Sequence, residues 1–356
     1  MKSKKRILVA PLDWGLGHAT RCIPVIKGLI NNDFEVIIAA DKRPLHLLMN
    51  EFPDIKTIRL PGYNVSYSKY LPMSICMLLQ SVKFFFKIQK EQNMLKQIIK
   101  EYSIDGVISD NRFGLSSKQV PCIFITHQLK IKLTWWGDDI FSHLIQRINY
   151  YYIKKYTTCW IMDCEKENIA GELSNPFKIP KNSIYIGTRS RFIKKELKKK
   201  YDFIGIISGP EPQRTIFENG LIKALQNRKE KSLIVLGKPE LNTEKKIGNL
   251  TIISHLNSQK LNTAILQSEL VICRSGYSTI MDLIKLEKNA FFIPTPGQTE
   301  QEYLARVLMQ KKICYMQKQS EFNLELGIYK CRDFSGFKNN KYTQYSWKEL
   351  LSFTFC

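Results

Sequence analysis

Short apolar runs alternate with segments of helical periodicity along the chain, and this alternation predicts an α/β fold. Residues 6–12 form the first apolar run and predict a buried strand. A segment with two glycines leads from it into a helix at 19–30, whose apolar positions follow a helical spacing. Residues 34–40 predict the second strand. A strand, a helix and another strand in this order open a doubly wound sheet.

The same alternation continues in two similar halves, which predicts two doubly wound domains. Further strands are expected at 104–110, 121–128, 159–163, 203–209, 232–236 and 250–253. The strand at 159–163 is expected to be the last of the first domain, which ends with residues 184–187. Between the halves, residues 188–200 carry seven Lys or Arg against one Glu and predict a basic hinge. We therefore expect an N-terminal domain at 1–187 and a second domain at 201–325. A tail at 326–356 follows, and a short helix at 347–353 in it could pack back on the first domain.

Residues 271–305 hold the densest group of chemical signals in the chain. An apolar strand at its start leads into the turn 274–276, and Ser278 and Thr279 can cap the helix that follows. The N-terminus of a helix presents free backbone N–H groups and a partial positive charge, which suit a phosphate. Asp282, one turn further on, can accept hydrogen bonds from two hydroxyls of a ribose. The stretch therefore predicts the capture of a nucleoside diphosphate.

Polar side chains follow two of the predicted strands of the first half. Asp110 and Asn111 end one strand, and His127 and Gln128 end the next. In open α/β sheets ligands bind beyond the carboxyl ends of the strands. These side chains are therefore expected to face a ligand-binding crevice.

Composition and charge limit the kinds of partner, cellular compartment and metal site that the chain is expected to have. The chain has 356 residues, is 44% hydrophobic and carries a formal net charge of +22, which favours anionic partners such as nucleic acid, an anionic membrane or phosphorylated substrates. The nine cysteines form no C-x-x-C pair, which argues for a reducing compartment and against zinc. No apolar run approaches the ~20 residues of a membrane span. These features predict a cytoplasmic protein without a metal site.

Several of these residues resemble the donor site of the MurG-like glycosyltransferases of family 28. The resemblance lies in the turn 274–276, Asp282, Pro294 and the pair 301–302, and the alignment runs without a gap to Tyr303. In the first half, the sequence Gly-Leu-Gly-His at 15–18 is similar to the end of the family's N-terminal glycine-rich loop. The resemblance implies the GT-B fold, in which two Rossmann-like doubly wound domains face each other across a cleft.

The resemblance also implies a set of residues that bind the nucleotide-sugar donor. These are Gly17, Ser208, Gly209, Arg214, Leu256, Arg274, Ser275, Gly276, Ser278, Thr279, Asp282, Gln301 and Glu302. The chain departs from the family pattern at several points. Asp282 is shorter than the family's Glu, and Glu302 stands where the family has a second Gln that contacts the sugar. His127 stands at a family Glu.

The activity implied is transfer of a sugar from a UDP-sugar to a hydroxyl acceptor, with inversion and without a metal or cofactor. N-acetylglucosamine is the sugar that the family suggests. His18 is the expected catalytic base because imidazole exchanges protons near neutral pH, with Asp110 and His127 as further candidates. A UDP-sugar 2-epimerase of the same fold remains an alternative. A basic nucleic-acid-binding protein is a weaker one, because no binding motif with base-stacking aromatics is present.

Residues 76–100 combine lysines with a cluster of phenylalanines on a predicted helix. A basic amphipathic helix with aromatic side chains can lie in an anionic membrane surface. The alternative is that the phenylalanines are core and the lysines form a solvated face. The first alternative predicts a peripheral protein at the inner face of the cell membrane. The family resemblance implies a glycan or lipid-linked acceptor, and no nucleic-acid partner is expected.

Overall fold

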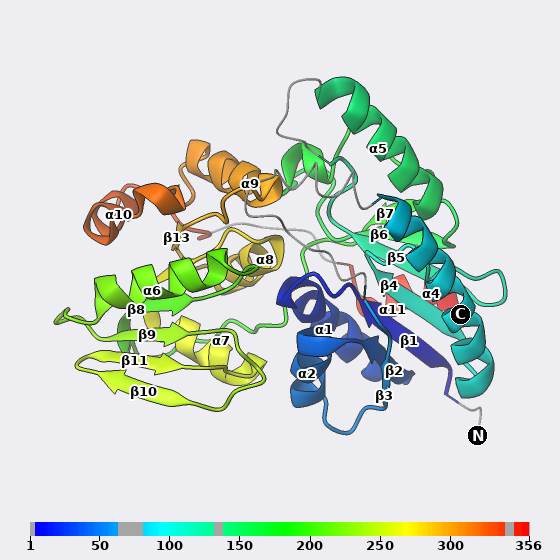
Figure 1. Ribbon diagram of the computed structural model, residues 1–356, viewed down its shortest axis with the longest axis horizontal. Coiled ribbons are helices and arrows are strands. Elements are labelled where there is room, and N and C mark those ends of the chain that lie inside the picture. Colours follow the sequence, from blue (N-terminus) through cyan, green and yellow to red (C-terminus); the bar gives the residue numbers. More distant parts are fainter. Residues whose placement is uncertain (1–3, 63–80, 132–137, 339–344, 356) are drawn as a thin grey trace. The chain divides into compact units, whose positions relative to one another are not determined.

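The computed structural model describes residues 4–62, 81–131, 138–338 and 345–355. It divides the chain into two compact units (Figure 1). Unit 1 comprises Met1–Arg189 and Tyr342–Cys356, and unit 2 comprises Ser190–Lys341. Within the described residues, no helix has the length and apolar character needed to span a bilayer.

Unit 1 is built on a parallel sheet with the strand order β3-β2-β1-β4-β5-β6-β7. Its strands are β1 (Arg6–Pro11), β2 (Glu35–Ala40), β3 (Thr57–Arg59), β4 (Gly106–Asp110), β5 (Cys122–Thr126), β6 (Thr158–Ile161) and β7 (Ser183–Tyr185). Its helices are α1 (Leu16–Ile30), α2 (Lys42–Glu51), α4 (Ser81–Tyr102), α5 (Asp138–Ile153), the short η1 (Gly171–Leu173) and the C-terminal α11 (Trp347–Phe355). Strands β2 and β3 lie on one side of β1 in the sheet, and β4 to β7 lie on its other side. The strand order therefore reverses between β1 and β4.

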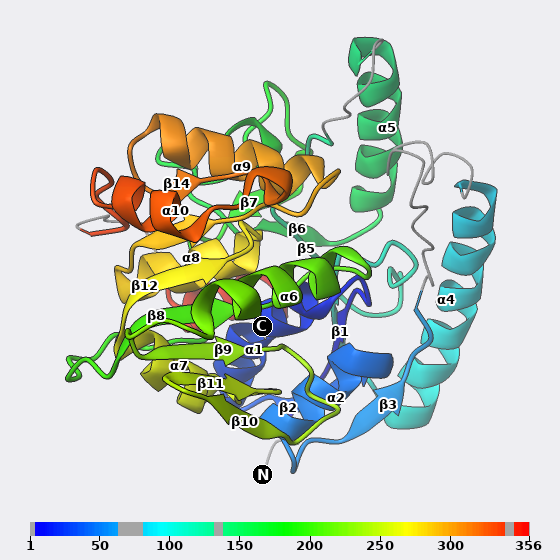
Figure 2. The ribbon, with the colours of Figure 1, turned by 60° about the vertical axis from the view of Figure 1, so that its left-hand side comes forward.

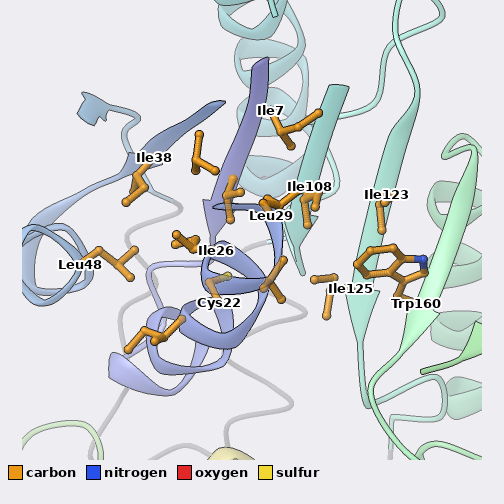
Figure 3. Close-up of a cluster of buried hydrophobic side chains, with 14 of the residues drawn as sticks. Ile7, Cys22, Ile26, Leu29, Ile38, Leu48, Ile108, Ile123, Ile125 and Trp160 are labelled. Atoms are coloured by element: carbon orange, nitrogen blue, oxygen red, sulfur yellow. The ribbon is translucent and has the colours of Figure 1, made fainter. Parts of the chain in front are cut away.

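Alternating side chains of β1 build two cores, one on each face of the sheet. Ile7 and Val9 belong to the core that α1, α2 and α11 cover, whereas Leu8 and Ala10 belong to the core that α4 covers. Figure 3 shows Cys22 of α1 with its neighbours in the first of these cores. Because both faces are buried, the strands read as continuous apolar runs, and this is why they could be found in the sequence.

Unit 2 repeats the architecture with the strand order β10-β11-β9-β8-β12-β13-β14. Its strands are β8 (Tyr201–Ile206), β9 (Ser232–Val235), β10 (Glu244–Ile247), β11 (Leu250–Ile253), β12 (Ser268–Cys273), β13 (Ala290–Phe292) and β14 (Tyr315–Met316). Its helices are α6 (Gln213–Leu225), α7 (Ser258–Leu266), α8 (Tyr277–Leu286), α9 (Thr299–Gln310), η2 (Gln319–Glu321) and α10 (Leu324–Cys331). Only β10 pairs antiparallel among the described strands. Phe217 and Leu221 of α6 pack on the sheet. Figure 2 shows helix α6 beside the strands of this sheet.

The structure corrects several element boundaries. Helix α1 begins at Leu16, so His18 lies in its first turn rather than in a loop. Helix α8 begins at Tyr277 with Gly276 as its N-cap, and no side chain caps it. The expectation that Ser278 and Thr279 cap this helix is therefore wrong, because both lie inside its first turn.

The structure also contains strands that the sequence did not predict, and it moves one domain boundary. Strand β7 follows β6 in the first sheet, so the strand at 159–163 is not the last of unit 1. Strand β10 was not predicted because three of its four residues are charged and exposed. The segment 190–200 belongs to unit 2, and α11 packs in the core of unit 1 through Trp347 and Leu351.

Candidate active site

A cluster of buried polar side chains lies at the carboxyl ends of three adjacent strands of unit 1. Asp110 is the last residue of β4, and His127 follows β5 directly. His18 and Arg21 come from the first turns of α1, which begins just beyond β1. Asp110 is fully buried, and Arg21 and His127 are 4% and 6% exposed. The structure thus brings together all three residues expected to act in proton transfer.

Arg21 connects the cluster. Its Nε donates to Asp110 Oδ2 at 3.2 Å, and a second guanidinium nitrogen donates to Asp110 Oδ1. Its guanidinium also lies 2.9 Å from His18 Nδ1 and contacts His127 Nδ1. Sequence reasoning missed Arg21. Its place three residues after His18, on one face of a helix, was the available signal.

Two groups of opposite character approach the same nitrogen of His18. Asp110 Oδ2 lies 3.2 Å from His18 Nδ1 and can only accept a hydrogen bond from it, whereas the Arg21 guanidinium can only donate a hydrogen bond to it. When His18 Nδ1 carries its proton toward Asp110, Nε2 is free to take a proton from a substrate. When Arg21 donates to Nδ1, the ring proton sits on Nε2 instead. Acid–base chemistry by His18 Nε2 therefore needs the contact with Asp110.

The charge state of Asp110 is set by two opposing effects. Burial alone would raise the pKa of this carboxyl, but the neighbouring Arg21 and His18 lower the pKa to about 2. Asp110 is therefore ionised at neutral pH and balances the buried Arg21. Burial and the Asp110 charge together raise the pKa of the Cys22 thiol, so this cysteine stays protonated.

Unit 2 holds the residues expected to bind the donor, again beyond the carboxyl ends of adjacent strands. Ser208 and Gly209 follow β8, and the turn 274–276 follows β12, its neighbour in the sheet. Gly209 has φ +108°, a conformation that favours glycine. Helix α8 begins directly after the second turn, at Tyr277, whereas α6 begins at Gln213, four residues after Gly209.

Arg274 is 1% exposed and ties three loops together. Its guanidinium donates to the carbonyls of Ile293 and Pro294 at 2.9 and 3.0 Å, to the carbonyl of Gln213 at 2.8 Å, and to Gln319. Burial lowers the pKa of Arg274 to about 10, so it keeps its charge at neutral pH. Arg214 is also buried, but it pairs with Glu211 and Glu218.

The remaining expected donor residues have these surroundings. Asp282 accepts from Ser190 Oγ at 2.6 Å and from Arg191 Nε at 3.3 Å. Gln301 accepts from the backbone N–H of Thr295 at 2.9 Å, and Glu302 accepts from that of Gly297 at 3.0 Å. Both therefore hold the loop between β13 and α9.

Of three further expected donor residues, one makes a hydrogen bond within these loops and two lie elsewhere. Ser275 Oγ donates to the carbonyl of Gln301 at 2.8 Å. Leu256 lines a hollow of about 420 Å³ between the sheet and α7. Gly17 lies in the first turn of α1, in unit 1. In the part of the chain that the structure describes, no group of three or more His, Cys, Asp or Glu side chains could hold a metal ion.

Comparison with known families identifies both halves of the chain. Residues 216–350 match the model of the glycosyltransferase family 28 C-terminal domain, and residues 5–141 match the model of glycosyl transferase family 1. No curated protein matches the chain significantly.

Solved structures of glycosyltransferases are similar over nearly the whole chain. MurG of Acinetobacter baumannii is 13% identical with a TM-score of 0.57, and 99% of each chain is covered. SsfS6 of Streptomyces sp. SF2575 is 10% identical with a TM-score of 0.59, covering 94% of this chain and 92% of that one. The spinosyn rhamnosyltransferase SpnG is 15% identical with a TM-score of 0.59, covering 93% of both. At these identities the likeness shows the fold.

The chain is a glycosyltransferase with the GT-B fold. Its second half carries the family 28 C-terminal domain, so the resemblance noted around the turn 274–276 is confirmed.

Proposed function

We propose that this glycosyltransferase transfers a sugar, N-acetylglucosamine, from a UDP-sugar to a hydroxyl acceptor with inversion and without a metal or cofactor. The observation that carries the proposal is the pair of loops after β8 and β12, each leading into a helix. The second loop lies inside the segment that the family 28 domain model matches, and the first lies just before it. Helix N-termini stabilise phosphate through free N–H groups and the helix dipole. SsfS6, a structural relative, has been crystallised with thymidine diphosphate.

In this mechanism unit 2 holds the donor, and unit 1 activates the acceptor. The N-terminus of α8 and the loop after β8, together with the charge of Arg274, stabilise the diphosphate as it leaves the sugar. His18 Nε2 removes the proton from the acceptor hydroxyl while Asp110 accepts a hydrogen bond from Nδ1–H and stabilises the imidazolium that forms. Attack from the side opposite the leaving diphosphate inverts the anomeric centre.

A thermal-shift panel of UDP-, TDP- and GDP-sugars tests the donor class. A ligand that binds the folded protein raises its melting temperature by mass action. We expect UDP-sugars to give the largest shift, and UDP-N-acetylglucosamine to be consumed only when a hydroxyl acceptor is present. Conversion of the sugar without an acceptor would show a 2-epimerase instead. A shift with polynucleotide and none with any nucleotide sugar would contradict the proposal.

The acceptor is proposed to be a glycan or lipid-linked molecule of the cell envelope, reached from a cytoplasmic, peripheral position on the membrane. The start of α4 supports this. Phe85 and Phe86 are 51% and 67% exposed, whereas Ile88 on the same helix is buried. Lys90 is exposed beside them. Aromatic side chains next to lysines are typical of helices that lie in an anionic interface.

Replacing Phe85 and Phe86 together by Ser should weaken binding to vesicles of phosphatidylglycerol and phosphatidylethanolamine by roughly tenfold or more, because two exposed aromatic side chains no longer enter the interface. Co-sedimentation with the vesicles measures the effect. Tyr329→Ser is the matched control, since Tyr329 is an aromatic residue of unit 2 with 62% exposure. Equal vesicle binding by the double variant and the control would contradict a membrane role for α4.

A further inference from the structure

The loop after β13 contributes a buried hydroxyl that the donor site had not been expected to use. Thr295 follows β13 by three residues and is 1% exposed. Its N–H donates to Gln301, and its carbonyl accepts from the N–H of Gln298 at 3.1 Å. Its Oγ1 has no hydrogen-bond partner. The backbone of Thr295 is thus fixed while its side chain is left unsatisfied.

A second unsatisfied polar atom lies near the same place. Arg274 Nε is buried and has no hydrogen-bond partner, although the other guanidinium nitrogens are bonded. Within the described part of the chain, none of the contacts of this guanidinium is to a carboxylate: they are to three carbonyls, one amide and the ring of Phe217. A buried cation normally has an anionic partner, because burying a charge alone is costly.

Gly209 lies close to both of these atoms. A Cβ at Gly209 would lie 3.2 Å from Thr295 Oγ1 and 3.9 Å from Arg274 Nε. The position is therefore close to both atoms, and glycine keeps it free of a side chain. β8, β12 and β13 are adjacent in the sheet, so the loops that carry Gly209, Arg274 and Thr295 meet at one edge.

We propose that Thr295 is a donor-binding residue whose hydroxyl, together with Arg274 Nε, holds one anionic oxygen of the donor's diphosphate beside Gly209. This inference rests on the proposed function and adds a residue to it. The oxygen satisfies both orphaned groups at once and supplies the negative charge that Arg274 lacks. Gln301 has a positioning role, because its side chain fixes the backbone of Thr295.

Replacing Thr295 by Val tests the proposal, since Val keeps the shape and removes only the hydroxyl. A hydrogen bond to a charged group corresponds to roughly a 10- to 100-fold change in affinity. We expect the full-length Thr295→Val protein to bind UDP roughly 10- to 100-fold more weakly by titration calorimetry. Its affinity for uridine, which lacks phosphate, should be unchanged, and Thr295→Ser should restore most of the UDP affinity.

Thermal stability without ligand separates a binding role from a structural one. An unsatisfied buried hydroxyl does not stabilise the fold, so Thr295→Val should melt at or above the temperature of the unaltered protein. The matched control is Ser268→Ala, which removes a buried hydroxyl that donates to the carbonyl of Ala264 at 2.6 Å. We expect this control to melt lower and to bind UDP normally.

Each outcome decides a separate point. If the unaltered protein binds no nucleotide sugar, the proposed function fails. If it binds UDP and Thr295→Val binds UDP equally well, only this inference is overturned. A lower melting temperature with equal losses for UDP and uridine would assign the hydroxyl a structural role and would also overturn it.

Discussion

The His18→Ala protein is expected to lose 100- to 10,000-fold in kcat, the range typical for removal of a general base, while binding UDP as well as the unaltered protein. The reason is the geometry of the cluster in unit 1. His18 is the histidine whose Nδ1 lies 3.2 Å from the ionised, fully buried Asp110. Steady-state kinetics with saturating donor, together with calorimetric titration of UDP, separates the chemical step from donor binding.

His46→Ala is the matched control, because His46 is exposed on α2 and belongs to no part of the cluster. It should keep its turnover. Normal kcat in His18→Ala would remove His18 as the base and direct attention to His127, which the same Arg21 contacts.

The Asp110→Asn protein should lose about 3–5 kcal/mol of unfolding free energy, because the substitution leaves the buried Arg21 guanidinium without its carboxylate. Urea unfolding followed by tryptophan fluorescence measures this loss in unit 1 alone, since all five tryptophans of the chain lie in that unit. Adding Arg21→Met to Asp110→Asn removes the orphaned charge and should recover a large part of the loss. If the double variant is less stable by the sum of both single losses, the two side chains are not coupled.

The same substitution has a signature in acid. The pKa of Asp110 in the folded protein is about 2, below the ~3.9 of an unfolded Asp. A lowered carboxyl pKa adds stability above pH ~4, and this part is lost as the pH falls from about 4 toward 2. Unit 1 of the unaltered protein should therefore lose more stability across that interval than unit 1 of Asp110→Asn. Identical pH profiles would show that the Asp110–Arg21 pair adds nothing to folding.

The fold could be predicted from the sequence because its strands are buried on both faces. Runs such as 6–12 and 270–273 stand out as continuous apolar segments, and the GT-B architecture inferred from them and from the family resemblance is confirmed. Strand β10 could not be found in this way, because an exposed edge strand needs no apolar side chains. The start of α1 was placed too late because Gly15 and Gly17 suggested a loop, whereas Gly15 is the N-cap and Gly17 lies within the helix.

The candidate site was predictable only where chemistry and spacing are local. The turn 274–276 could be found because strand, turn and helix follow each other directly. Arg21 was missed because its carboxylate partner lies 89 residues further along the chain, and its spacing from His18 was the single local signal. Thr295 was missed for a similar reason, since its proposed role in donor binding depends on Arg274 and Gly209 in two other loops. A residue whose role depends on contacts between distant segments can be recognised only when the fold is known.

The proposed function requires that the diphosphate of a nucleotide sugar rests on the loops that lead into α6 and α8. A crystal structure of the full chain with UDP tests it most directly. We expect both phosphates within hydrogen-bonding distance of the backbone at Gly209 and Gly276, with one oxygen on Thr295 Oγ1. UDP bound at any other place, with these two loops unoccupied, would contradict it.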